Sequence, residues 1–363
     1  MRTILIILLM FWPALGQSMT VTFINPGLED EQYWVDGING MKAAAASLGI
    51  QLEVLHAQRD PVRQIELVAA VAARPPEQRP DYLLLSVEKS TFGAKMPLAE
   101  AAGIDVFLAY NGLTPEEKTL HGGPRDRYRH FLGSLNPRAE EAGELTARRL
   151  IEQARLLGLT DTAGQIQGFA IAGDRSTESS IRRNQSMQQV MAGEDVVLHQ
   201  VVYADWRQDQ GQIKAEHLLV RYPDTRFVWA GNDLIAFGAM AAAEERGLKP
   251  GRDILFSGIN TSPEAMRDVI SGRLTALAGG HYMTGAWSLV ILYDFHHGVD
   301  FAETEGLEMA RSMFHLFTPE SARLFLARFS DRVPAIDFRR YSKVLNPGLD
   351  RYRFGFGQLL EQP

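Results

Sequence analysis

The sequence predicts an α/β protein built from two doubly wound parallel-sheet lobes. Short apolar runs alternate with helical patterns at the spacing of β-α-β units, and this alternation begins again near residue 131. No long segment rich in Pro, Gly or Ser separates the two sets. We therefore expect a chain that crosses between two lobes several times, with parallel strands joined by right-handed connections.

One stretch, residues 221–247, illustrates the repeating unit. A turn signal at 222–224 precedes the apolar run 227–230, which has the length of a strand covered on both faces. Asn232 and Asp233 follow the run, and a helical pattern begins directly after them, with Asp233 as its expected N-cap. Polar side chains are thus expected at the carboxyl end of a strand, where open α/β sheets bind ligands.

The same pattern assigns the first lobe. Expected strands cover residues 21–25, 52–56, 81–86 and 105–110, and expected helices cover 38–48, 61–72 and 95–102. Polar residues follow two of these strands: Ser86 and Glu88 follow the third, and Asn111 follows the fourth. These residues are candidates for the ligand-binding edge of the first sheet.

The second set continues the alternation. Expected strands start near 131–134 and then cover 167–172, 196–202, 227–230, 253–257 and 274–277; expected helices cover 137–157, 180–192, 210–220, 234–246, 263–272 and 284–297. Trp206 lies in a polar loop between Asp205 and Arg207, whereas Trp229 lies inside an apolar strand and is expected in the core. Asn260 and His281 each follow a predicted strand.

Composition excludes several classes of protein. The chain of 363 residues is long enough for two hydrophobic cores, and its net charge of −7 provides no basic face for nucleic acid. It contains no cysteine, which excludes disulfides, thiolate metal sites and a cysteine nucleophile. We expect neither a metal nor a cofactor.

The N-terminus resembles an export signal. Met1 and Arg2 precede a short apolar segment at 4–12, and the small-residue site at 14–16 suits cleavage. The apolar segment is too short to span a membrane, so we expect residues 1–19 to be removed and the protein to work in the periplasm. An uncleaved anchor is the alternative.

Residues 21–298 resemble the type I periplasmic sugar-binding proteins, a class that includes ribose-type binding proteins and the effector domain of the lactose repressor. The most specific match is Tyr222-Pro223-Asp224 followed by an apolar run and Asn232-Asp233, with support from residues 171–173 and 256–260. Residues 31–34 also resemble the autoinducer-2 receptor, a sensory relative. The resemblance implies two lobes joined by a three-strand hinge, with a ligand between the strand ends.

This resemblance implies lobes formed by residues 20–133 with 281–310 and by 134–280 with 311–345, followed by a tail at 346–363. The whole C-terminal part, residues 301–363, is longer than a simple member needs, and its Arg339, Arg340, Arg351 and Arg353 are candidates for docking a partner. Two departures leave the ligand open: Asn111-Gly112 replaces a common Asp-Arg pair, and Gly279-Gly280 stands where relatives carry Gln or Arg.

Nine side chains are expected to bind the ligand. Aromatic faces suit the C–H side of a sugar, amides both donate and accept hydrogen bonds, and Arg183, preferred over its neighbour Arg182, offers a bidentate donor. Glu88 and His281 are included because they follow predicted strands. The set is Tyr33, Trp34, Glu88, Asn111, Arg183, Trp206, Asn232, Asn260 and His281.

An enzyme is a less favoured class. The sequence contains no GxxxxGK[ST], GxSxG or HExxH motif, although Glu29 or Glu88 remains open as a glycosidase carboxylate. We expect no catalytic residue and instead a monomeric binding protein for a small, polar, sugar-like ligand. Its expected partner is the inner-membrane permease of an ABC importer; the alternative is a membrane sensor such as a kinase or diguanylate cyclase.

Overall fold

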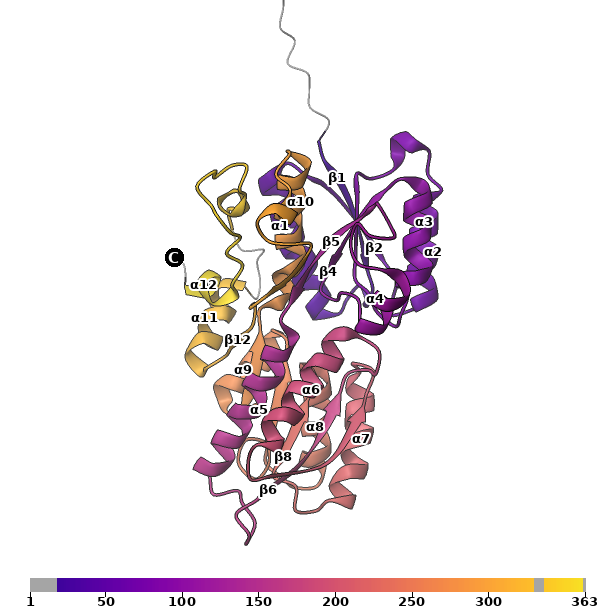
Figure 1. Cartoon of the computed structure of the whole chain (residues 1–363). Coiled ribbons are helices and arrows are strands. Elements are labelled where there is room, and N and C mark those ends of the chain that lie inside the picture. Colours follow the sequence, from indigo (N-terminus) through magenta and orange to yellow (C-terminus); the bar gives the residue numbers. More distant parts are fainter. Residues whose placement is uncertain (1–17, 330–335, 362–363) are drawn as a thin grey trace, which may run out of the picture.

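The computed structural model describes residues 18–329 and 336–361, which form two α/β lobes stacked end to end (Figure 1). The predicted signal segment lies almost entirely outside the described residues. In the described part of the chain, no helix has the length and apolar content required to cross a membrane.

The first lobe contains a parallel sheet of six strands in the order β11-β5-β4-β3-β1-β2. Its strands are β1 (Thr20–Asn25), β2 (Gln51–His56), β3 (Tyr82–Leu85), β4 (Asp105–Ala109), β5 (Phe131–Pro137) and β11 (Glu308–Arg311). Helices α1 (Gln32–Leu48) and α10 (Thr284–His296) pack together, as do α2 (Pro61–Ala72) and α3 (Phe92–Ala102). Every residue of β3 is buried, as expected for a parallel strand covered on both faces.

The second lobe repeats this design with the strand order β12-β10-β9-β8-β6-β7. Its strands are β6 (Ile166–Ala172), β7 (Val196–Tyr203), β8 (Phe227–Ala230), β9 (Leu255–Ile259), β10 (Ala276–Gly279) and β12 (His315–Leu316), of which β12 pairs antiparallel to β10. Its helices are α5 (Ala139–Leu156), α6 (Glu178–Ala192), α7 (Gln208–Arg221), α8 (Asp233–Glu245), α9 (Pro263–Ser271) and α11 (Pro319–Phe329). Trp229 is fully buried, which confirms its assignment to the core.

The predicted fold class is confirmed; the differences lie at the boundaries and in elements that were not predicted, which include β11, β12 and α11. The chain passes between the sheets after β5, after β10 and between β11 and β12. Since β5 continues to Pro137, the first crossing comes a few residues later than the boundary expected at 133. Helix α4 (Pro115–His121) was not predicted, although Thr114 and Glu117 form a capping box at its start.

The tail after α11, described over residues 336–361, returns to the first lobe, contrary to the expected assignment of all of residues 311–345 to the second; β12 and α11 do lie in the second lobe. The 3-10 helix η4 (Phe338–Tyr341) packs on α1 and α10. Buried Asp294 of α10 accepts hydrogen bonds from the Lys343 backbone amide at 2.6 Å and from the Tyr352 hydroxyl at 2.9 Å. Lys343 and Glu305 form a buried ion pair at 2.6 Å, so this part of the tail is fixed on the first lobe.

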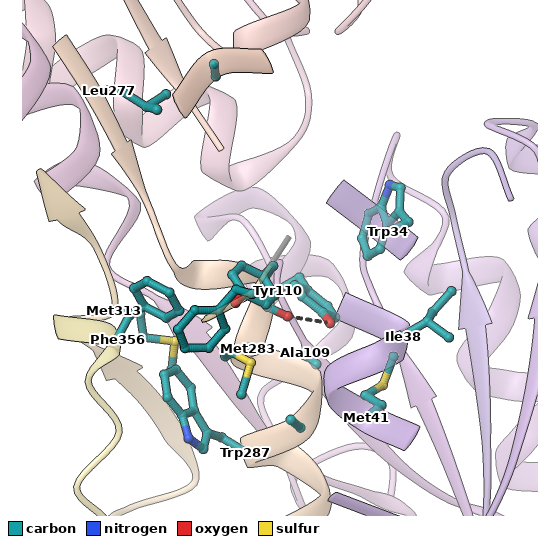
Figure 2. Packing of buried hydrophobic residues seen from close by; sticks show 14 of the residues in the cluster. Trp34, Ile38, Met41, Ala109, Tyr110, Leu277, Met283, Trp287, Met313 and Phe356 are labelled. Carbon is teal, nitrogen blue, oxygen red and sulfur yellow. Dashed lines mark hydrogen bonds between the residues drawn. The ribbon is translucent and has the colours of Figure 1, made fainter. Parts of the chain in front are cut away.

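The end of the tail lies against the hinge. Helix α12 (Phe356–Glu361) contacts α11, and the Phe356 ring lies 5.5 Å from that of Tyr282, just after the crossing at Gly280. Gly280 has a φ of 110°, and a Cβ atom there would come within 2.3 Å of the Phe356 ring. Figure 2 shows Phe356 in one apolar cluster with Met283, which follows the crossing, and Trp287 of α10, near Tyr110.

Replacing Phe356 with Ala should lower the free energy of unfolding by about 3 kcal/mol, because a fully buried ring is removed and a cavity is left beside the hinge. Urea denaturation followed by circular dichroism measures this change. The matched control is Gln358→Ala on the exposed face of the same helix, which should stay within about 0.5 kcal/mol. Equal stabilities of the two variants would contradict the packing described.

Candidate functional site

A cleft of about 570 Å³, including its open mouth, lies between the lobes where the carboxyl ends of the two sheets meet. Each strand from β1 to β10 contributes at least one lining residue at or after its carboxyl end. The lining residues are Gly27, Glu31, Tyr33, Trp34, Arg59, Glu88, Tyr110, Asn111, Pro137, Thr177, Ser179, Arg183, Trp206, Asn232, Asn260 and His281. The structure thus brings all nine predicted side chains to one cleft; their contact with a ligand stays a prediction.

Aromatic rings form one wall. The Tyr33 ring lies edge-on to Trp34 at 4.9 Å, and Trp34 lies edge-on to Tyr110 at 5.1 Å. Trp34 is also packed against Gly27, where a Cβ atom would come within 2.0 Å of the indole. Because Trp34 is buried and Tyr33 is only partly buried, Tyr33 is the better placed of the two to meet a ligand face.

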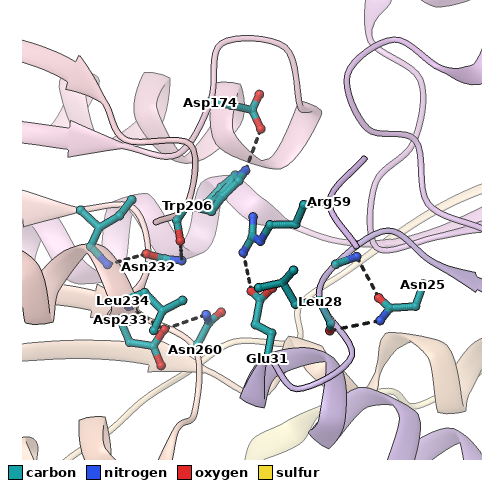
Figure 3. A network of polar contacts seen from close by, with 12 residues as sticks. Asn25, Leu28, Glu31, Arg59, Asp174, Trp206, Asn232, Asp233, Leu234 and Asn260 are labelled. Carbon is teal, nitrogen blue, oxygen red and sulfur yellow. Dashed lines mark hydrogen bonds and ion pairs between the residues drawn. The ribbon is translucent and has the colours of Figure 1, made fainter. Parts of the chain in front are cut away.

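The first lobe contributes acidic groups to the cleft. Glu31 and Arg59 form an ion pair at 2.6 Å, which leaves the other carboxylate oxygen of Glu31 buried without a partner among the described residues. Burial raises the pKa of Glu88 to about 7, an effect that the positive charge of Arg59 partly opposes. Figure 3 shows Arg59 and Glu31 facing Trp206 and Asn260 of the second lobe.

Arg183 of α6 is the charged residue of the opposite wall. Its guanidinium donates to the Gly231 carbonyl oxygen at 3.0 Å and lies 3.0 Å from Nε2 of His281. Because a guanidinium can only donate, Nε2 of His281 is the acceptor and Nδ1 carries the proton. Burial and the charge of Arg183 lower the pKa of His281 well below its usual value, which also keeps the imidazole neutral.

This pairing leaves two buried donors without partners. In the described part of the chain, neither Nε of Arg183 nor Nδ1 of His281 has a hydrogen-bond partner. Both residues are at least nine-tenths buried and line the cleft. Unpaired buried polar groups are costly, so a ligand that supplies acceptors to them gains affinity.

Trp206 is fixed in place from behind. Its Nε1 donates to the Asp174 carboxylate at 2.7 Å, and its ring covers Gly173, where a Cβ atom would lie 2.4 Å from the indole. Burial opposes ionisation of Asp174, but hydrogen bonds from Thr177, Ser176 and Trp206 lower its pKa overall. The indole therefore presents a fixed face next to the cleft.

Asn232, which lines the cleft, also takes the helix-capping role predicted for Asp233. Asn232 is the N-cap of α8: its side-chain oxygen accepts from the Ile235 amide at 2.9 Å, and its NH₂ group donates to the Trp206 carbonyl oxygen at 3.3 Å. Asp233 is the first helical residue and accepts from the Asn260 side chain at 2.9 Å. The expected N-cap role of Asp233 was therefore wrong, and Asn232 and Asp233 both support neighbouring cleft residues.

The backbone is strained around the cleft. Nine non-glycine residues of the described chain have a positive φ, and eight of them follow the carboxyl end of a strand: Gln58, Arg59, Lys89, Ser90, Tyr110, Asp205, Trp206 and Asn260. Such conformations cost about 1 kcal/mol or more each and cluster at ligand sites. Their positions are independent support for a binding site at this edge.

Several lining residues were not predicted. Glu31, Arg59, Tyr110, Thr177 and Ser179 all lie within a few residues of a strand's carboxyl end. That position alone was a usable signal for Tyr110, which directly precedes Asn111. The ion pair between Glu31 and Arg59 joins two loops 28 residues apart and could be found only from the fold.

Comparisons with known proteins agree with this geometry. A family profile described as periplasmic binding protein domain matches residues 21–295. The ribose import binding protein RbsB of Escherichia coli is 24% identical over 67% of this chain and 73% of its own length. The galactofuranose-binding protein YtfQ of the same species is 26% identical over 72% of this chain and 77% of its own length.

Solved structures agree as well. A periplasmic sugar-binding protein from Pseudomonas fluorescens aligns with a TM-score of 0.85 and 34% identity, over 95% of this chain and all of the other. A galactofuranose binding protein aligns with a TM-score of 0.70 and 18% identity, over 86% of this chain and 98% of the other, which supports the fold alone.

The raised pKa of Glu88 makes a pH-dependent prediction. In the unfolded chain this carboxyl ionises near pH 4.5, whereas in the native state it ionises near pH 7. Between these two values the native state binds more protons than the unfolded chain, so the free energy of unfolding falls as the pH rises. The Glu88→Gln variant should not show this fall. The difference in the free energy of unfolding between the variant and wild type should therefore change by about 2 kcal/mol in favour of the variant from pH 4.5 to pH 7.5. Urea titrations across this range measure the difference. The control Glu66→Gln, at an exposed carboxylate of α2, should follow wild type; a Glu88→Gln curve parallel to wild type would contradict the assignment.

Proposed function

The chain belongs to the periplasmic binding protein domain family, and we propose that it binds a neutral, polyhydroxylated small molecule, a sugar or sugar alcohol, in the cleft between its lobes. The carrying observation is the set of unpaired buried atoms, with donors on Arg183 and His281 and an acceptor on Glu31. Hydroxyl groups both donate and accept, so one ligand can satisfy all three.

The charges of the cleft favour a neutral ligand. Arg59 and Arg183 supply the positive charges; Glu31 is paired with Arg59, and Glu88, whose pKa is about 7, is partly ionised at neutral pH. A carboxylate ligand would meet Glu31 and Glu88 on the first lobe without a spare cation there, because Arg59 is already paired. The aromatic wall of Tyr33 and the face of Trp206 suit the C–H surfaces of a sugar ring.

Ligand binding is coupled to closure in this proposal. Tyr33 and Glu88 come from the first lobe, and Arg183, Trp206 and Asn260 come from the second. A ligand that contacts both sides binds the closed state better than the open one and shifts the population toward it. The three crossing segments are the hinge about which the lobes move.

We assign the protein to the periplasm as the solute-binding component of an ABC importer, where it delivers the ligand as a monomer to an inner-membrane permease. The name of the relative RbsB, a ribose import binding protein, supports this role. The second candidate is a sensory subunit. It is favoured by the tail fixed across the hinge, which carries exposed Arg339 and Arg340 on the first lobe. Co-purification with a permease, or with a membrane receptor, distinguishes the two roles.

A glycosidase is not supported by the site. Such an enzyme places two carboxyl groups on opposite sides of the bond that it cleaves. Glu31 and Glu88 both come from the first lobe, Glu29 is exposed outside the cleft, and no carboxylate of the second lobe is among the described lining residues.

The ligand class is tested by thermal shift. Pentoses, hexoses in pyranose and furanose forms, and sugar alcohols are compared with amino acids and dicarboxylates on the purified protein. A compound that binds only the native state raises the melting temperature by mass action. We expect a neutral polyhydroxy compound to do so; stabilisation by carboxylates or amino acids alone would disprove the proposed class.

The role of Arg183 is tested with an exposed arginine as the control. Arg183→Met should weaken binding of the identified ligand by about 30-fold, because a buried charged donor is lost. Arg148→Met removes the same charge from an exposed position of α5 outside the cleft and should leave the dissociation constant unchanged. Isothermal titration measures both, and equal effects of the two changes would contradict the assigned role.

A further inference from the structure

Helix α6 of the second lobe begins without a cap of its own. Thr177 occupies the N-cap position, but no side-chain capping bond is formed there. Its hydroxyl instead donates to the Asp174 carboxylate at 2.5 Å. The first backbone amides of α6 therefore need acceptors from elsewhere.

The first lobe supplies one of these acceptors. The side-chain oxygen of Asn111, directly after β4, accepts from the Ser179 backbone amide at 3.2 Å. Ser179 is the second residue of α6, whose amide an N-cap side chain normally satisfies. Asn111 thus caps a helix of the opposite lobe.

A second bond runs the other way. The Glu178 carboxylate, on the first residue of α6, accepts from the Gly112 backbone amide at 3.3 Å. The Asn111 side chain of the first lobe accepts from an amide of α6, and the Glu178 side chain of α6 accepts from an amide of the first lobe. This is the reciprocal pattern of a capping box, here divided between two lobes.

Both partners are held in position. The Asn111 NH₂ group donates to the Ser86 hydroxyl at 3.2 Å, which orients the amide oxygen toward α6. Buried Lys95 fixes the same strand end by donating to the Ser86 carbonyl oxygen at 2.9 Å. Arg182, one helical turn along α6, hydrogen-bonds the other oxygen of Glu178.

The contact excludes most solvent. Asn111 is 5% exposed, Ser179 is 8% exposed, and the Glu178 side chain is 12% exposed. The carboxylate also lies at the positive end of the helix dipole, which favours its charge there. Opening the cleft would break both bonds and return these groups to water.

We propose that Asn111 and Glu178 form a latch that stabilises the closed arrangement of the lobes independently of the ligand. The latch sets the fraction of molecules in the binding-competent state, and the apparent dissociation constant varies inversely with that fraction. The latch rests on the proposed function only where it concerns ligand affinity, because its two hydrogen bonds involve no ligand. Asn111 then acts as a positioning residue of closure.

The latch is tested on the ligand-free protein. Since the natural chain has no cysteine, Glu66→Cys on α2 and His217→Cys on α7 supply the two spin-label sites, one on each lobe. Pulsed electron paramagnetic resonance then measures the distance distribution between the lobes. Glu178→Ala removes one bond of the latch without removing a cleft-lining residue.

In the labelled protein we expect a measurable short-distance population, and Glu178→Ala should lower its ratio to the long-distance population by about fivefold. The matched control is Glu144→Ala, which removes an exposed helix carboxylate paired only with Arg148. It should leave the distribution unchanged. Two results would overturn the proposal. One is a labelled protein that shows only the long distance before Glu178 is changed, and the other is the same distance distribution for Glu178→Ala and Glu144→Ala. Because no ligand is present, this outcome is independent of whether the ligand class is correct.

Discussion

The buried contact between Arg183 and His281 is the interaction on which the binding site depends. It joins α6, the end of β8 through the Gly231 carbonyl oxygen, and the crossing segment after β10. Burial lowers the pKa of Arg183 to about 10, which leaves it charged at neutral pH. His281 must therefore stay neutral, and the unpaired donors of both residues favour a ligand with acceptor oxygens.

The site also depends on backbone geometry that only a parallel sheet edge provides. Loops at ten strand ends converge on one cleft, and several hold non-glycine residues at positive φ. Side chains behind the cleft, such as Asp174 and Asp233, orient the residues that line it. The cleft is consequently shaped before a ligand arrives, which reduces the ordering cost of binding.

Local patterns predicted ten of the twelve described strands and nine of the twelve described α-helices, because strand periodicity and chain reversal are local properties; β11, β12, α4, α11 and α12 were missed. Strand ends predicted Glu88, Asn111, Asn232, Asn260 and His281, whereas Tyr33, Trp34 and Arg183 came from the family resemblance. The errors concern tertiary partners. Asn232 rather than Asp233 caps α8, and the tail returns to the first lobe through Asp294. Asn111 lines the cleft as expected, but the hydrogen bond that it accepts from α6 was not predicted, because it depends on how the two lobes meet. Short-range patterns carry no information on such partners.

A crystal structure of the protein with the polyhydroxy compound that stabilises it most tests the central claim directly. The account predicts ligand density between Tyr33 of the first lobe and Trp206 of the second, with ligand oxygens within hydrogen-bond distance of Nε of Arg183 and Nδ1 of His281. Ligand bound outside this cleft, or a cleft occupant that leaves both nitrogens unpaired, would contradict the account.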